Sequence, residues 1–188
     1  YPAGAHWRKP RRQASIVIST GERVFVCFNA KEVQWLRRHG FRRADQDARL
    51  GGDLIRDALV APELLRRIDA FCAPQTLLVD LLLDQRIAAG IGNVYKSEVL
   101  FLERAAPLRR VRDLTGDALL ALYRRAAALL GENLGGGPRT TRFTADVRGG
   151  LWVYGRADLP CRRCAAPVRR GLLGAQPRST YWCEHCQG

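Results

Sequence analysis

Methionine is missing from this sequence, and the chain begins at Tyr1. Because no initiator residue is present, we expect the chain to be the later part of a longer protein with a segment before Tyr1. Lysine is scarce: Lys9, Lys31 and Lys96 are the only three, so nearly all of the positive charge is arginine. Arginine favours bidentate contacts with phosphate, although genome composition can produce the same bias.

Long apolar runs are also absent. No stretch approaches the roughly 20 apolar residues that cross a bilayer, and none has the pattern of a secretory signal peptide. We therefore expect a soluble cytoplasmic protein with no membrane partner.

What the chain does have is charge of one sign. The 31 Lys and Arg residues outnumber the 18 Asp and Glu residues, which gives a net charge of +13 and a pI near 10.4. Such an excess favours nucleic acid as the partner, with an acidic membrane surface second and a plain basic surface as the remaining alternative. The 47% of hydrophobic residues are enough for a sizeable core, so the chain is predicted to be globular.

The residue patterns predict an α+β protein in three parts. Residues 1–50 hold two β-branched and aromatic runs around a turn at Thr20–Glu22, which predict a hairpin at the end of a larger sheet. Residues 51–144 follow a predicted hinge at Gly51–Gly52 and have the periodicity of helices. Residues 145–188 carry short strands and four cysteines after a basic, glycine-rich linker.

The middle part is expected to contain several helices. These are a helix from Pro62 that ends before Pro74, then Gln75–Asp84, Asn93–Glu103 and a helix capped by Thr115 that runs to about Asn133. The predicted buried faces are Leu64, Leu65, Ile68, Phe71 and Cys72 in the first helix and Leu119, Leu120, Tyr123, Ala127 and Leu130 in the last. Cys27 and Cys72 lie among apolar residues and are predicted to be buried thiols.

The other four cysteines form two C-x2-C pairs, Cys161 with Cys164 and Cys183 with Cys186, separated by 18 residues. Each short gap lets both thiolates of a pair reach one tetrahedral zinc ion, and the spacer is long enough for a β-hairpin. Four sulfur ligands leave no position for water, so we expect one structural zinc ion. Two disulfides are the alternative, and His185 could replace one thiolate.

The spacer between the two pairs is basic and aromatic. Arg178, which follows Pro177, is the best single candidate for a contact with a phosphate or the minor groove. Ordinary packing of a hairpin explains the neighbouring Tyr181 and Trp182 equally well.

Gly90 and Gly92 precede a predicted helix that begins with Asn93. Two glycines let the backbone pass close to a bulky ligand, and the start of a helix presents free N–H groups to an anion. We therefore predict a phosphate site formed by Gly92, the Asn93 side chain and the charge of Lys96, with Ile91 and Val94 anchoring the turn. The alternative is a turn that serves only tight packing between helices.

The segments "LLLDQRIAAGIGNVYKSEVLF", "VYGRADLPCRRC" and "RSTYWCEHCQ" occur in this order along the chain. From about Asp53 to the end, the sequence resembles the C-terminal half of the formamidopyrimidine-DNA glycosylase and endonuclease VIII family of base-excision repair enzymes. The resemblance implies a helix–two-turns–helix module centred on residues 85–98 and a zinc-finger β-hairpin. It also implies that Asn93 and Arg178 grip phosphates of damaged double-stranded DNA and that the four paired cysteines bind zinc.

The catalytic residues of that family are not identifiable in the chain. Family members attack the sugar C1′ with the amine of an N-terminal proline that is followed by glutamate, whereas Pro62–Glu63 is internal and its amide nitrogen is not a nucleophile. We therefore expect the nucleophile and the acid/base upstream of Tyr1, an inactive fragment, and residues 1–50 as the last strands of a β-sandwich domain.

Two features bear on the substrate. The stretch "NAKEVQWLRR" lacks the Arg-Phe-Gly signature of many members that act on oxidised purines, and the linker Gly135–Gly150 is short for their capping loop. The resemblance thus favours excision of a flipped oxidised pyrimidine by a monomeric glycosylase and lyase. The alternative from another class is a non-catalytic nucleic-acid-binding zinc module.

Overall fold

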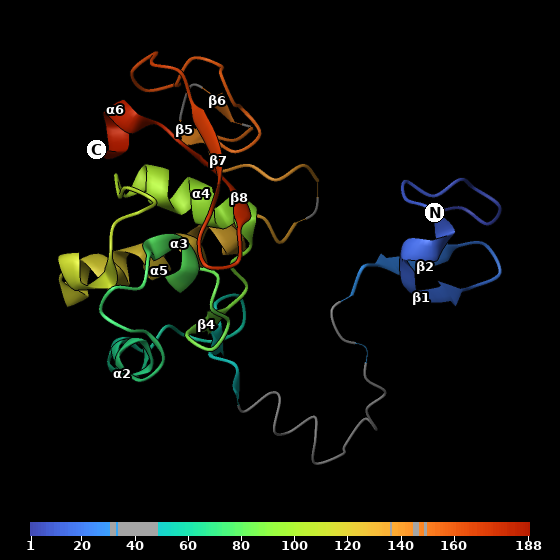
Figure 1. Ribbon diagram of the computed structural model, residues 1–188, viewed down its shortest axis with the longest axis horizontal. Coiled ribbons are helices and arrows are strands. Elements are labelled where there is room, and N and C mark those ends of the chain that lie inside the picture. The colour runs from blue at the N-terminus through green and yellow to red at the C-terminus, as the bar shows by residue number, and fades with distance from the viewer. Residues whose placement is uncertain (31–32, 34–48, 136, 145–146, 149) are drawn as a thin grey trace. The chain divides into compact units, whose positions relative to one another are not determined.

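The computed structural model describes residues 1–30, 33, 49–135, 137–144, 147–148 and 150–188. The chain forms two compact units, Tyr1–Gln46 and Asp47–Gly188 (Figure 1). The second unit contains both the predicted middle part and the predicted C-terminal part, which pack together. Among the described residues, no helix is both long enough and apolar enough to cross a membrane.

The first unit contains a hairpin of β1 (Ala14–Ser19) and β2 (Val24–Phe28), preceded by the short helix η1 (Arg11–Gln13). The predicted hairpin is thus confirmed. The prediction that Cys27 is buried is wrong, because Cys27 is exposed. Within the described part of this unit the sheet has two strands, and apolar side chains such as Val17 and Phe25 are exposed on it as well.

The second unit begins with β3 (Gly52–Asp53), which pairs in parallel with β4 (Ala88–Ala89). The N–H of Gly51 donates to the carbonyl of Gln85 at 2.8 Å. Of the two glycines predicted as a hinge, Gly52 therefore lies in a small sheet and Gly51 is hydrogen-bonded just before it.

Helix α2 (Ala61–Phe71) has proline in its first turn, as predicted, and buries Leu64 and Ile68. Phe71, expected on the buried face, is 43% exposed and lies against the guanidinium of Arg86, 5.0 Å from its ring centroid. Cys72 is half-buried, and this burial raises the pKa of its thiol to about 11.

The helix predicted over Gln75–Asp84 is mostly wrong, because only α3 (Leu78–Leu81) is helical there. The N–H groups of Leu83 and Asp84 donate to carbonyls three residues earlier, at 3.2 Å in both cases, so the chain tightens into turns. Leu78, Leu81 and Leu82 are fully buried in the core. Because the segment is surrounded by the core, most of its residues are apolar, and this run resembled a buried helix in the sequence.

Helices α4 (Asn93–Leu102) and α5 (Gly116–Glu132) agree closely with the predicted bounds. Thr115 caps α5, since its hydroxyl accepts from the N–H of Ala118 at 3.3 Å. The face that α5 buries is wider than predicted and consists of Leu119, Leu120, Leu122, Tyr123, Ala126, Leu129 and Leu130. Figure 1 shows α4 between α5 and the C-terminal strands, and α4 contacts both.

The C-terminal strands form two hairpins. The linker contains β5 (Phe143–Thr144) and β6 (Val147–Arg148), and the cysteine spacer forms β7 (Arg169–Leu173) and β8 (Arg178–Trp182). Two short helices complete the unit, η2 (Val111–Asp113) and α6 (Glu184–Gln187). A small core joins Phe101 of α4 to Val153, Val168 and two of the cysteines, so the second hairpin shares its core with the helical part.

Candidate nucleic-acid interface and metal centre

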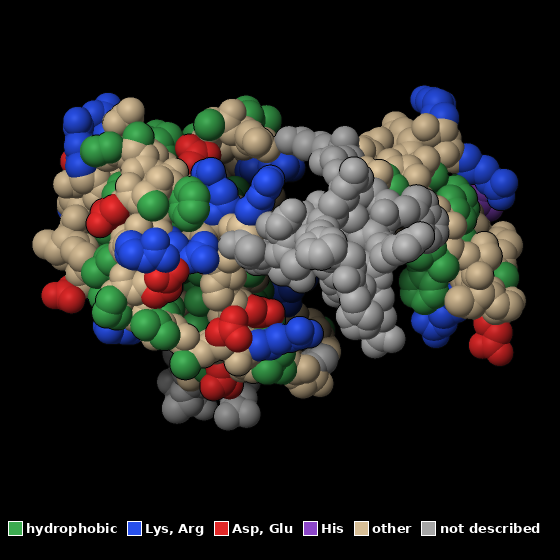
Figure 2. All heavy atoms as spheres, turned by 90° about the horizontal axis from the view of Figure 1, so that it is seen from below, with side chains coloured by type: hydrophobic (Ala, Val, Ile, Leu, Met, Phe, Trp, Pro, Cys, Tyr) green, Lys and Arg blue, Asp and Glu red, His purple; other side chains and the backbone are tan. Residues whose placement is uncertain are grey.

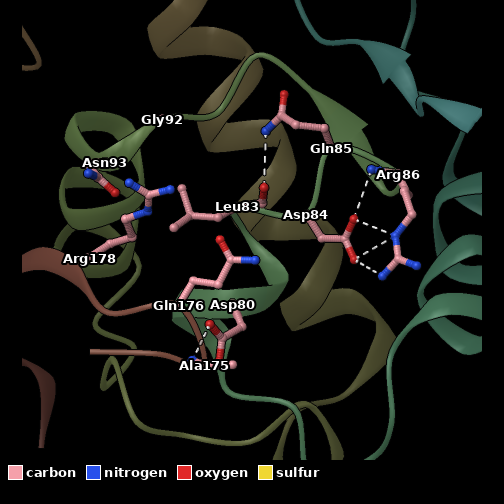
Figure 3. Close-up of a pocket in the computed structure, with 10 residues that line it drawn as sticks. All are labelled: Asp80, Leu83, Asp84, Gln85, Arg86, Gly92, Asn93, Ala175, Gln176 and Arg178. Atoms are coloured by element: carbon pink, nitrogen blue, oxygen red, sulfur yellow. Dashed lines mark hydrogen bonds and ion pairs between the residues drawn. The ribbon is translucent and has the colours of Figure 1, made fainter. Parts of the chain in front are cut away.

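A cleft of about 610 Å³ lies between the turn that precedes α4 and the tip of the β7–β8 hairpin (Figure 3). Its lining comes from three segments: Asp80, Leu83, Asp84, Gln85 and Arg86; Gly92 and Asn93; and Ala175, Gln176 and Arg178. The cleft therefore brings together Asn93 and Arg178, which the sequence places far apart and predicts as phosphate ligands.

The glycine turn on one wall of the cleft is held by Gln85. The N–H of Gly90 donates to Oε1 of Gln85 at 3.0 Å, and Nε2 of Gln85 donates to the carbonyl of Ile91 at 3.0 Å. Gly90 has a φ of +117°, a value that favours glycine, and Ile91 is buried. A Cβ atom on Gly92 would meet nothing within 4 Å, so the backbone here is open to a ligand.

Helix α4 begins at this turn. Its first intrahelical hydrogen bond runs from the N–H of Lys96 to the carbonyl of Gly92 at 2.9 Å. The N–H groups of Asn93, Val94 and Tyr95 precede that bond and form the positive end of the helix. An anion in the cleft would therefore meet a favourable dipole beside the Asn93 side chain.

Arg178, the first residue of β8, lines the opposite wall. Its side chain is exposed and makes no hydrogen bond or ion pair within the described part of the chain. Asp84, also on the cleft, accepts from Nη2 of Arg86 at 2.6 Å. Burial by itself would raise the pKa of Asp84, but the hydrogen bonds from Arg86 outweigh it and lower that pKa. Arg178 thus remains available to an anionic ligand.

Lys96, predicted to bring its charge to the phosphate site, lies beside Asn93, and its side chain is 0% exposed. Its Nζ atom donates to Oγ1 of Thr180 at 2.8 Å, to the carbonyl of Ser179 at 3.2 Å and to Oδ1 of Asn93 at 3.4 Å. Burial is the main cause that lowers the pKa of Lys96 to about 8, with Asp80 opposing the shift and Arg178 adding to it. Lys96 therefore links α4 to the hairpin and does not present its charge to solvent.

Glu98 of α4, which the sequence analysis missed, binds the segment that precedes the β7–β8 hairpin. Its buried carboxylate accepts from the N–H groups of Trp152 (2.8 Å), Val153 (2.9 Å) and Tyr154 (2.8 Å), and from the Thr141 hydroxyl. Three consecutive polar residues, 96–98, directly before the apolar run Val99–Leu102 were the signal that could have revealed these contacts.

The four paired cysteines converge on one point. Their Sγ atoms all lie within 4.8 Å of one another, with Cys161 and Cys186 3.9 Å apart and Cys164 and Cys183 3.5 Å apart. His185 is exposed and lies outside this group. Four thiolates this close would repel one another unless a cation lay between them, so the donor set fits a tetrahedral metal ion with sulfur ligands.

Net charge alone does not locate the interface. On the face seen in Figure 2, the Lys and Arg side chains of the second unit lie in several groups, with Asp and Glu side chains beside them. The cleft, in contrast, combines an unpaired arginine with the positive end of a helix.

Comparison with known proteins gives the family. The model of the formamidopyrimidine-DNA glycosylase H2TH domain matches residues 56–145. The chain is 37% identical over 191 residues to the probable endonuclease 8 2 of Streptomyces coelicolor, with 100% of this chain and 67% of the relative covered. The chain belongs to the formamidopyrimidine-DNA glycosylase and endonuclease VIII family. The resemblance predicted from the sequence is thus confirmed.

Two further members of this family show how much of it the chain represents. The DNA-(apurinic or apyrimidinic site) lyase Nei2 of Mycolicibacterium smegmatis is 40% identical over 153 residues, which cover 78% of this chain and 56% of the relative. The crystal structure of the MutM (Fpg) protein from Thermus thermophilus aligns with a TM-score of 0.65 at 33% identity and covers 96% of this chain and 63% of that one. The chain therefore spans between 56% and 67% of these three proteins.

The family model covers some of the predicted site residues and not others. The matched residues 56–145 include the glycine turn, Asn93 and α4, whereas Arg178 and the four cysteines lie beyond them. Most of the stretch "NAKEVQWLRR", which carried part of the prediction about the substrate, lies outside the described residues.

Proposed function

We propose that this chain is the DNA-gripping part of a base-excision-repair glycosylase and lyase. Phosphates flanking a lesion in duplex DNA bind in the cleft, to Asn93, the Gly92 backbone and the N–H groups at the start of α4 on one wall and to Arg178 on the other. The observation that supports this best is the cleft itself, which joins an exposed, unpaired arginine to the open end of a helix.

A structural zinc ion bound by Cys161, Cys164, Cys183 and Cys186 completes the hairpin that carries Arg178. The strands β7 and β8 share only a small core with α4, so metal binding would supply much of the hairpin's folding energy. With four sulfur ligands the ion has no free position, and its role is to hold the hairpin.

In the whole protein, an amine upstream of Tyr1 attacks C1′ of a nucleotide whose base has been flipped out of the duplex. The bond from C1′ to the base breaks, a Schiff base forms and β-elimination cleaves the strand. Oxidised pyrimidines are the favoured substrates, in line with the endonuclease 8 name of a relative and with the short linker that holds β5 and β6.

Two amines in the described part of the chain, those of Tyr1 and Lys96, are not placed for that chemistry. The Tyr1 amine donates to the carbonyl of Val24 at 2.9 Å, and Lys96 is buried against three acceptors. We therefore propose that these 188 residues bind damaged DNA but do not excise a base. The whole protein acts as a cytoplasmic monomer.

Binding of the zinc-loaded chain to a duplex with a tetrahydrofuran abasic-site analogue tests the proposal. Arg178→Ala and Asn93→Ala should each weaken binding by about 1–3 kcal/mol, because each removes hydrogen bonds to phosphate. Loss of Arg178 should also reduce the slope of log K against log salt by about 0.9, since one fewer counterion is released.

Arg124→Ala is the matched control, because Arg124 is exposed on α5 and does not line the cleft. If Arg178→Ala and Asn93→Ala bind the duplex as Arg124→Ala does, the phosphate site is not in this cleft. If the chain binds DNA but the full-length protein excises no base, the non-catalytic binding module is the better description.

A further inference from the structure

We propose that Asp80 and Lys96 are positioning residues that hold Arg178 in a fixed place across the cleft from Asn93. This inference rests on the proposed phosphate contact of Arg178. The two residues act on the hairpin tip from both sides of Arg178, and both belong to the helical part that carries Asn93.

The first tie comes from Asp80 on α3. Its Oδ1 and Oδ2 atoms accept from the N–H of Ala175 at 2.9 Å and 3.2 Å, three residues before Arg178. Gly174 makes this approach possible. It has a φ of +96°, and a Cβ atom there would overlap the Asp80 carboxylate.

The second tie comes from Lys96 on α4. Its ammonium group donates to the carbonyl of Ser179 and the hydroxyl of Thr180, the two residues that follow Arg178. The backbone at Arg178 is therefore held at both ends, at Ala175 and at Ser179–Thr180, by side chains from one rigid core. In Figure 3 the Asp80 carboxylate meets Ala175 at the base of the tip, and Arg178 reaches into the cleft from the same segment.

The same lysine also orients Asn93. An ammonium group has only donors, so the Asn93 amide presents Oδ1 to it, at 3.4 Å. The Nδ2 group takes no part in this contact, so its hydrogens would be available to a phosphate oxygen. Lys96 thus sets both partners of the proposed phosphate grip, and the grip needs little ordering when DNA binds.

Because Asp80 is negatively charged, its replacement should change DNA affinity in opposite directions under the two explanations. A carboxylate on the wall of a phosphate site repels DNA, so its electrostatic effect alone predicts tighter binding after its removal. Positioning of the hairpin tip predicts weaker binding after removal of the acceptor. Asp80→Asn removes the charge and keeps an acceptor oxygen, whereas Asp80→Ala removes both.

The test compares these two variants in the zinc-loaded chain with the tetrahydrofuran duplex. We expect Asp80→Ala to weaken binding about five- to tenfold, the effect of one lost backbone hydrogen bond. Asp80→Asn should bind at least as tightly as the parent chain. In an Arg178→Ala background, Asp80→Ala should cause no further weakening, because Asp80 positions the tip for Arg178 and only its repulsion of DNA is left to lose.

Three outcomes would overturn the inference: Asp80→Ala binding as tightly as the parent, both Asp80 variants binding more tightly than it, or effects of Asp80→Ala and Arg178→Ala that simply add. Each would leave the proposed function intact as long as Arg178→Ala binds weakly. If Arg178→Ala binds like the parent, the proposed function itself fails. Zinc content and a thermal melt of each variant show whether the hairpin is folded.

Discussion

Replacing Lys96 by methionine tests the burial of its charge. Burial lowers the pKa of Lys96 from 10.5 to about 8. A shift of this size corresponds to about 3 kcal/mol of unfavourable free energy for the charged form in the folded chain. Methionine has a similar length and no charge, so Lys96→Met removes this pH-dependent contribution and leaves the other titrating groups in place.

The sign follows from where the protons are bound. Below about pH 8 the lysine is protonated in both the folded and the unfolded chain, and the full penalty of burial is present. Between about pH 8 and pH 10.5 the unfolded chain still binds the proton and the folded chain has released it, so stability rises with pH. From pH 7 to pH 10 the parent should therefore gain about 2–3 kcal/mol over Lys96→Met.

Urea unfolding of both zinc-loaded chains at several pH values measures this difference. Lys9→Met is the matched control, because Lys9 is exposed and the same chemical change there should leave the difference from the parent unaltered. If the curves of the parent and Lys96→Met run parallel from pH 7 to pH 10, Lys96 is not a buried cation and the reasoning is wrong.

Three further predictions concern the metal, Glu98 and the chemistry. Elemental analysis should find one zinc per chain, and Cys161→Ser should abolish protection from hydrogen exchange in β7 and β8 while α5 stays protected; full DNA affinity after metal removal would contradict this. Glu98→Ala should lower the free energy of unfolding by about 3–5 kcal/mol, because three backbone N–H groups lose their acceptor, whereas the exposed Glu132→Ala should change it little. Borohydride should trap no adduct between these residues and an abasic duplex, and a trapped adduct would place a nucleophile in this chain.

Local patterns predicted the elements whose stability is decided locally. Thr115 accepts the capping hydrogen bond at the start of α5, and α4 begins at Asn93, where the glycines end. The spacing of the four cysteines predicted that their sulfur atoms would meet. In the first two cases neighbouring residues provide the interaction that determines the structure, and in the third each short pair brings two sulfur atoms together before the pairs meet across the hairpin.

The apolar patterns gave wrong predictions where a segment is buried on several sides, or is exposed, and does not bury a single face. The leucines of residues 77–83 suggested one long helix, but only Leu78–Leu81 is helical, because the chain turns within the core. Cys27 was expected to be buried from its apolar neighbours in sequence, yet it lies on the exposed face of β2. Apolar character predicts burial but does not identify the partner that provides it.

The sequence by itself determined the family, the helical module and the pairs of cysteines, because short motifs with defined spacing encode them. Only the tertiary structure decided what Lys96, Glu98 and Asp80 do. Each of these charged side chains binds residues more than 40 positions away, in the hairpin or in the linker before it. The sequence does not show whether a charged residue faces water or bridges two segments. That is decided only when the hairpin packs on α4.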